Sequence, residues 1–163
     1  MVKESIFNML QNSIDFDAIT VLDIYAGSGS LGLEALSRGA SEVHFVEQNF
    51  SVSKVLYSNI KLLEAEANCK IIKRSAYKFS ASEKHNRYDL ILADPPFFKD
   101  DVHSVFKNLI ERDFLNEHGI LIVERSVQTK KKDIEAFGIE PKKKIGDSLI
   151  YWYGANNKVA LGN

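Results

Sequence analysis

The sequence predicts an α/β fold, in which a mostly parallel sheet of seven strands is covered by helices on both faces. Short apolar runs alternate with amphipathic stretches of helical spacing along the chain, and the chain closes with a strand–turn–strand pattern. Repeated strand–helix units indicate parallel strands, because each helix carries the chain back across the sheet. We expect residues 1–163 to form a single domain, since no linker-like segment interrupts them.

The expected elements follow from the position of each apolar run. Buried parallel strands are continuous apolar runs, whereas covering helices have apolar residues at every third or fourth position. The turn signal Gly146-Asp147 predicts that the last two strands form an antiparallel hairpin. We expect strands at 19–24, 43–46, 69–73, 88–93, 119–123, 142–145 and 148–153. We expect helices at 2–10, 31–36, 51–64, 101–112 and 130–137.

Composition places the chain among ordinary globular proteins, with 45% hydrophobic and 26% charged residues. No apolar run approaches the ~18 residues of a membrane span, so no membrane partner is expected. The single cysteine, Cys69, excludes an internal disulfide and fits a reducing cytoplasm. A net charge of −1 argues against a dedicated nucleic-acid binder, so any such contact must come from local patches.

A glycine-rich loop follows the first expected strand. Gly27, Gly29 and Gly32 satisfy the pattern G-x-G-x-x-G between a strand and a helix, which indicates a Rossmann-like ligand site. Glu47 ends the second expected strand, at the spacing typical of a carboxylate that accepts both ribose hydroxyls. Both features suit a dinucleotide as well as S-adenosylmethionine.

Two details favour S-adenosylmethionine. Asp23 lies just before the loop, where a carboxylate attracts the cationic methionine half of that ligand and repels a pyrophosphate. The alternative is that Asp23 only caps the amides of the loop. The second detail is the length of the chain. A nicotinamide-dependent dehydrogenase normally needs a further substrate domain, and 163 residues leave no room for one.

The tetrapeptide Asp94-Pro95-Pro96-Phe97 follows the expected strand at 88–93. A doubly wound sheet binds ligands beyond the carboxyl ends of its strands, so Asp94 should emerge beside the glycine loop. Asp94 and the Pro95 carbonyl can both accept from one exocyclic amine, while Phe97 offers a face for a stacked base. We therefore expect methyl transfer to a planar nitrogen, with no metal. The alternative is a rigid loop with Phe97 and Phe98 packed into the core.

Local basic clusters lie at 130–132 and 142–144, and the favoured interpretation is a solvated surface near the C-terminal hairpin. Lys99, which follows the tetrapeptide, is the stronger candidate for a phosphate contact. The four histidines show no metal-ligand spacing.

Further stretches match one bacterial family in sequence and position. They are residues 2–10, 22–29, 32–40, Asn59, 94–97, 123–124 and Tyr151. Over nearly its whole length the chain resembles the RsmD family of bacterial 16S ribosomal RNA (guanine-N2)-methyltransferases. The resemblance implies S-adenosylmethionine as cofactor and the N2 amine of one guanine as the methylated group. It also implies ribosomal RNA as partner, within a small-subunit assembly particle, and we expect a cytoplasmic monomer.

The resemblance also implies roles for particular residues. Asp23, Gly27 and Gly29 would hold the methionine portion of the cofactor, and Glu47 the ribose. Ser75 and Ala76 would flank the adenine, although many relatives carry an acidic or amide residue where Ser75 stands. The candidate catalytic residues are Asp94, Pro95, Pro96 and Phe97. The candidate cofactor-binding residues are Asp23, Ala26, Gly27, Ser28, Gly29, Glu47, Gln48, Ser75 and Ala76.

Other functions stay open at this point. Close alternatives are methylation of a DNA adenine amine or of a protein glutamine amide, since the tetrapeptide suits several planar nitrogens. From a different class come a nicotinamide-dependent oxidoreductase and a non-catalytic nucleotide-binding module. Family members carry a basic N-terminal hairpin before the first helix, and we expect this hairpin to be missing here, where the helix begins at Val2.

Overall fold

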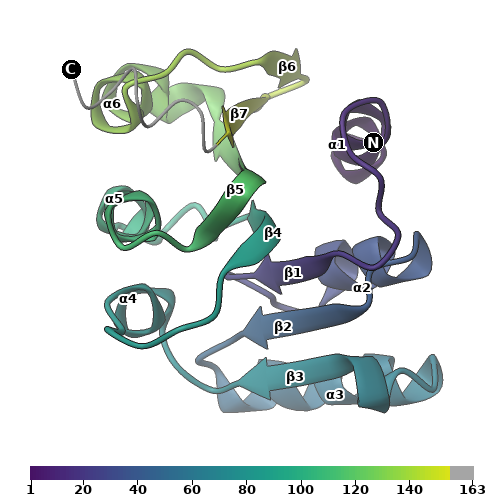
Figure 1. The fold of residues 1–163 in the computed structure, drawn as a ribbon. Helices are drawn as coiled ribbons and strands as arrows, with labels where there is room; N and C mark the ends of the chain where they lie inside the picture. Colours follow the sequence, from purple (N-terminus) through teal and green to yellow (C-terminus); the bar gives the residue numbers. More distant parts are fainter. Residues whose placement is uncertain (155–163) are drawn as a thin grey trace.

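A seven-stranded sheet runs through the centre of the protein in a computed structural model that describes residues 1–154 (Figure 1). Its strand order is β3-β2-β1-β4-β5-β7-β6. Strands β1 to β5 pair in parallel, whereas β7 is antiparallel to both β5 and β6. The strands are β1 (Thr20–Asp23), β2 (Glu42–Val46), β3 (Cys69–Ile72), β4 (Tyr88–Ala93), β5 (Leu115–Ser126), β6 (Lys143–Ile145) and β7 (Ser148–Gly154).

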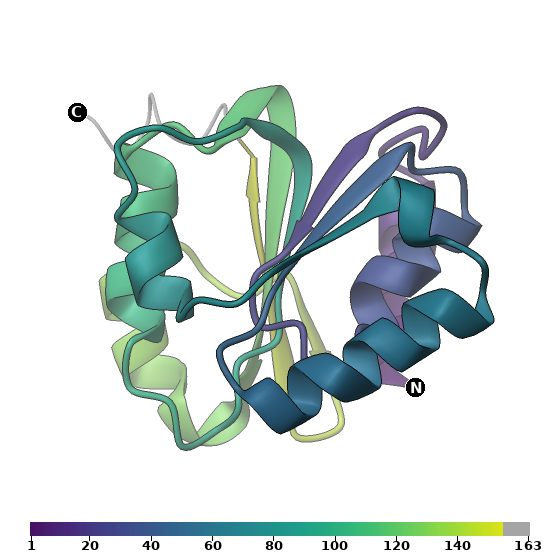
Figure 2. The same cartoon turned by 90° about the horizontal axis from the view of Figure 1, so that it is seen from below.

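Helices cover both faces of the sheet, as the view from below shows (Figure 2). One face carries α1 (Val2–Gln11), α2 (Ser30–Ser37) and α3 (Phe50–Leu62). The other carries α4 (Ala76–Ser80), α5 (Val102–Glu111) and α6 (Lys130–Phe137). Two 3-10 turns lie at Glu66–Asn68 and Val127–Thr129. None of the helices in residues 1–154 is long and apolar enough to cross a membrane.

The central strand β4 explains why the sheet is sandwiched between two cores. Leu90 and Leu92 pack into the core under α1, α2 and α3, while Ile91 and Ala93 pack into the core under α4, α5 and α6. Successive side chains of a strand point to opposite faces, so a run that is apolar at every position must be buried on both. The predicted α/β fold, with its parallel sheet and antiparallel C-terminal hairpin, is confirmed.

Two elements differ from the expectation. Helix α4 was not predicted, because its five residues are too few to show helical periodicity. The Ser75 hydroxyl begins it by accepting from the Lys78 amide at 3.1 Å. Strand β5 extends well beyond the predicted 119–123, since residues 116–118 are polar and exposed at least in part and so interrupt the apolar pattern.

Candidate active site

Parallel strands bring the three candidate carboxylates to one edge of the sheet. Asp23 ends β1, Glu47 directly follows β2, and Asp94 directly follows β4. These carboxyl groups lie close enough to influence one another. Burial is the main cause that raises the pKa of Asp23, and the nearby Asp94 and Glu47 carboxylates raise it further. The carboxyl ends of β1, β2 and β4 therefore bring acidic groups together, which suits a cationic ligand.

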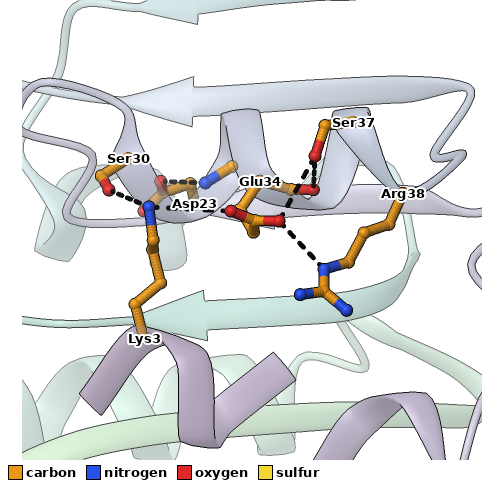
Figure 3. Close-up of polar contacts among 7 residues, drawn as sticks. Lys3, Asp23, Ser30, Glu34, Ser37 and Arg38 are labelled. Carbon is orange, nitrogen blue, oxygen red and sulfur yellow. Dashed lines mark hydrogen bonds and ion pairs between the residues drawn. The ribbon is translucent and has the colours of Figure 1, made fainter. Parts of the chain in front are cut away.

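The two carboxyl oxygens of Asp23 differ in their hydrogen bonding. Its side chain is buried, and its Oδ2 accepts from the Gly32 amide of α2 at 2.9 Å (Figure 3). The other oxygen, Oδ1, is buried and has no hydrogen-bond partner among residues 1–154. Burial chiefly, then Asp94 and Glu47, raise the pKa of Asp23 to about 8, although the Gly32 amide opposes the shift. A buried carboxylate oxygen without a partner costs ~1–3 kcal/mol, which an arriving ammonium group would relieve.

The glycines of the loop have two different purposes. Gly27 has a φ of +56°, and a Cβ built on it would meet nothing within 4 Å, so its backbone faces open space. Gly29 has a φ of +90°, and a Cβ there would run into Leu56 of α3. A Cβ on Gly32 would collide with the ring of Phe45 in β2. Gly27 therefore leaves room for a ligand, whereas Gly29 lets the loop lie close to α3 and Gly32 allows close packing of α2 against the sheet.

Hydrogen bonds from outside the loop hold it in place. The Glu47 carboxylate accepts from the Gly27 amide through Oε1 and from the Asn49 amide through Oε2, both at 2.9 Å. The side-chain amide of Asn59 donates to the Ser28 carbonyl at 2.9 Å, which ties the loop to α3. The Ala26 amide donates to the Val46 carbonyl at 3.0 Å. The half-buried Glu47 thus sits against the loop with its carboxylate oriented.

The other cofactor candidates lie at the same edge. Gln48 is exposed and follows Glu47, while Ser75 and Ala76 lie just beyond β3, at the start of α4. Because the Ser75 hydroxyl already accepts from Lys78 and Ala76 is buried, a contact from either to an adenine would use the backbone. These assignments stay predictions.

The tetrapeptide forms one wall of a pocket of ≈ 490 Å³ at the carboxyl ends of β4 and β5. Phe97 is 90% exposed and Phe98 is 72% exposed, so the alternative of two phenylalanines packed into the core is wrong. An aromatic ring left in water beside a polar pocket is suited to stacking on a planar ligand. The pocket is lined by Asp94, Pro95, Phe97, Glu124, Arg125, Ser126, Gln128, Thr129, Asp147 and Ser148.

Two acceptors of the tetrapeptide, the Asp94 carboxyl and the carbonyl of the buried Pro95, take part in no hydrogen bond within residues 1–154. The Pro95 carbonyl accepts none of the hydrogen bonds found within residues 1–154, whereas the Pro96 carbonyl closes a turn with the Lys99 amide at 3.0 Å. Asp94 is exposed at the rim of the pocket, but the protein packed around its carboxyl and then the charge of Glu124 raise the pKa of Asp94 to about 6. Asp94 is thus ionised near neutral pH yet basic enough to take up a proton.

Sequence reasoning gave no role to the wall opposite the tetrapeptide. Glu124 accepts from the Ser148 hydroxyl at 3.0 Å, and the neighbouring Arg125 donates from Nε to Asp133 at 2.9 Å. Asp133 is fully buried and also contacts Thr129 and His103, and these hydrogen bonds hold its pKa below the ordinary value although burial alone would raise it. The sequence could have predicted that Glu124 and Arg125 lie at the site, because both stand near the carboxyl end of a parallel strand beside β4.

The fold and the site together define the class of protein. The strand order, with a glycine loop after β1 and a carboxylate after β2, is that of the S-adenosylmethionine-dependent methyltransferases. Within that class the chain belongs to the RsmD family, since the family described as Conserved hypothetical protein 95 matches residues 1–154. The predicted family is confirmed, and with it the cofactor.

Comparison with known proteins supports the family assignment, and the matches cover most of each protein's length. The Ribosomal RNA small subunit methyltransferase D of Escherichia coli strain K12 is 31% identical, over 92% of this chain and 74% of that protein. The Bacillus subtilis protein YlbH is also 31% identical, over 89% of this chain and 85% of its own. The solved structure of the Escherichia coli protein yhhF matches with a TM-score of 0.79 at 28% identity, covering 94% of this chain and 85% of that one.

Within residues 1–154, no group of three or more histidine, cysteine, aspartate or glutamate side chains is arranged to hold a metal ion.

Proposed function

We propose that this protein transfers a methyl group from S-adenosylmethionine to the exocyclic N2 amine of a guanine in small-subunit ribosomal RNA. The observation that carries the proposal is the pocket, in which Asp94 and the Pro95 carbonyl offer acceptors beside the exposed ring of Phe97. The E. coli relative, whose name identifies it as a ribosomal RNA small subunit methyltransferase, supports the choice of RNA. Such an enzyme would work in the cytoplasm, on ribosomal RNA or on a small-subunit assembly particle.

The charge of the pocket favours guanine over adenine. Guanine presents donors at both N1 and N2 along its Watson–Crick edge, whereas adenine presents an acceptor at N1. Asp94 and Glu124 both line the pocket and lie close enough for Glu124 to raise the pKa of Asp94. Two adjacent carboxylates can accept from both donors of guanine, but one of them would face a lone pair of adenine.

The residues present fit the cofactor. Gly27 leaves the loop backbone open, Asp23 presents a buried oxygen without a partner, and Glu47 is oriented beside the loop. Asp23 would hold the ammonium group of the methionine half, and Glu47 the ribose hydroxyls. When bound, S-adenosylmethionine supplies a methyl group on a positively charged sulfur.

The tetrapeptide then acts on the amine. Asp94 and the Pro95 carbonyl accept from its two hydrogens and orient the nitrogen lone pair out of the ring plane. Transfer of the methyl group would leave the amine nitrogen positively charged, and the electron pair of the broken bond would remain with the cofactor. Asp94 takes the surplus proton from nitrogen and releases it to solvent, which its pKa of about 6 allows. Phe97 stacks on the base and excludes water from one face.

Product analysis tests the proposal. The protein is incubated with S-adenosylmethionine carrying a labelled methyl group and with 16S ribosomal RNA, naked or assembled with proteins, taken from cells that lack the gene. The RNA is digested to nucleosides and separated by liquid chromatography. We expect the label in N2-methylguanosine. Label in N6-methyladenosine would contradict the choice of guanine, and label in protein or DNA but not in RNA would contradict the choice of substrate.

A further inference from the structure

We propose that the edge of the sheet around β3 is a second RNA-binding surface, which holds the sugar–phosphate backbone of the substrate at a distance from the methylated base. The inference rests on the proposed function for the identity of the nucleic acid. We call this surface the β3 edge. It consists of the cations Lys54, Lys70, Lys73, Arg74 and Lys84 and the aromatic residues Phe50 and Tyr57.

Two hollows flank β3 and adjoin one another. One, of ≈ 510 Å³, lies between α3 and β3 and is lined by Phe50, Lys54 and Tyr57 among others. The other, of ≈ 520 Å³, lies on the opposite side of the strand and includes Lys70, Arg74 and Lys84. Ile71 and Lys73 line both hollows. Among residues 1–154, no carboxylate side chain lines either hollow, whereas Asp94, Glu124 and Asp147 line the pocket at the tetrapeptide.

The cations of the β3 edge are not neutralised by the protein. Within residues 1–154, none of the five forms an ion pair with a carboxylate. Elsewhere the protein does pair its cations: Lys3 and Arg38 both reach Glu34, at 3.7 and 3.0 Å (Figure 3). In a chain of net charge −1, five neighbouring cations without carboxylate partners form a local positive field that suits phosphate groups.

The aromatic residues add a second feature of RNA-binding surfaces. Phe50 is 62% exposed and Tyr57 is 52% exposed, and both lie on α3 with Lys54 between them. The ammonium groups of Lys54 and Lys73 lie 4.6 and 5.3 Å from the centre of the Phe50 ring. Exposed rings interleaved with cations are the combination that binds single-stranded nucleic acid, in which bases stack while phosphates are neutralised.

The β3 edge is reachable from the pocket. Lys73 follows β3 at the same carboxyl edge as Glu47, whose amide donates to the Ile72 carbonyl at 3.1 Å. Three strand spacings separate β3 from β4, which is about 14 Å at ~4.8 Å per strand. A few nucleotides span that distance, so RNA with its target base in the pocket can lie across the β3 edge.

A simpler explanation covers only part of the pattern. Lysines on an edge strand prevent edge-to-edge pairing of sheets, and β3 is an edge strand. That explanation accounts for Lys70 and Lys73, next to or within the strand. It does not account for Lys54 on α3, Lys84 in the loop after α4, or the exposed rings.

Binding of a fluorescein-labelled single-stranded RNA of mixed sequence, followed by fluorescence anisotropy, tests the inference. The edge variant is Lys54→Gln/Lys73→Gln/Lys84→Gln. The matched control is Lys130→Gln/Lys131→Gln/Lys132→Gln on α6, which removes the same charge from exposed positions. We expect the edge variant to weaken binding at least about tenfold and to reduce the slope of log K against log salt by about 2, since single strands contribute ~0.7 per phosphate. We expect the control to change the slope by much less.

Two further measurements complete the test. The variant Phe50→Leu should weaken binding by about fivefold without changing the salt slope, because stacking does not depend on salt. The edge variant should bind S-adenosylhomocysteine normally and methylate RNA with an unchanged kcat and a raised KM. Equal loss of binding in the edge variant and the control, or no loss in either, would overturn the inference. Failure of the protein to methylate any RNA, with edge binding intact, would instead count against the proposed function.

Discussion

The pocket at the tetrapeptide and the β3 edge lie on the same sheet but differ in nearly every property. The pocket contains three carboxylates and one arginine, and that arginine is paired with the buried Asp133. The β3 edge has exposed rings and cations that form no ion pair with a carboxylate of residues 1–154. Under the two proposals, one region accepts hydrogen bonds from a base and takes up a proton, and the other attracts phosphate.

The separation of the two regions lets opposite local charges coexist in a chain of low net charge. A positive patch beside Asp94 would lower its pKa and weaken it as a proton acceptor, whereas a carboxylate beside Lys73 would cancel the attraction for RNA. Placing the two regions at different strands keeps both properties. The overall charge of −1 is then the sum of opposite local charges and does not predict what the protein binds.

The largest effect should come from the pocket. Asp94→Ala removes one acceptor and the proton acceptor, so turnover should fall at least about a hundredfold. S-adenosylhomocysteine affinity and RNA affinity should stay within a few-fold of the wild type. The control is Asp100→Ala in the same loop, an exposed residue that does not line the pocket. Initial rates of methyl transfer measure the difference, and turnover near the wild-type rate would remove Asp94 from its assigned role.

The next largest effect should be that of salt concentration, which should change RNA affinity but not methylation in the pocket. If four cations of the β3 edge contact phosphate, RNA affinity should fall roughly fiftyfold between about 50 and 200 mM salt, at ~0.7 per contact. Methylation at saturating RNA should hardly change, because the pocket holds an uncharged base. Anisotropy and rate measurements in the same buffers give both values. An RNA affinity that is insensitive to salt would contradict the division between the regions.

Phe97 should show a smaller effect within the pocket. Phe97→Ala removes the stacking face and should lower kcat/KM by about tenfold, since stacking contributes ~1–3 kcal/mol per base. Phe98→Ala is the matched control, because Phe98 is exposed and adjacent but does not line the pocket. Steady-state kinetics with ribosomal RNA compare the two variants. Equal losses of kcat/KM would contradict the assignment of base stacking to Phe97.

The smallest effect concerns pH. Asp94 must be ionised to accept, so kcat should rise as pH increases through about 6 and should be about half its plateau there. The negative charge of Glu124 helps to raise this pKa, so Glu124→Gln should move the midpoint to lower pH. The pH–rate profile of both proteins measures the shift. A midpoint that is the same in both would mean that another group controls the profile.

Much of this arrangement could be predicted from local sequence. The strand order places the glycine loop and the tetrapeptide at one edge, and both motifs are contiguous, so Asp23, Gly27 and Asp94 were identifiable. The β3 edge was not, because its cations come from α3, β3 and two loops and meet only in the folded chain. Runs such as 130–132 drew attention instead, although they are simply exposed on α6. Asp133 follows that run and gave no sign that its carboxylate is buried.

The antiparallel direction of β7 has a consequence for how such enzymes diverge. Because β7 runs against the other central strands, it is its first residue, Ser148, that reaches the carboxyl edge, directly after the Gly146-Asp147 turn. One wall of the pocket therefore includes the tip of a hairpin, which lies far from the glycine loop in the sequence. Insertions or substitutions at that tip can change the shape of the pocket without altering the glycine loop or strands β1 to β3.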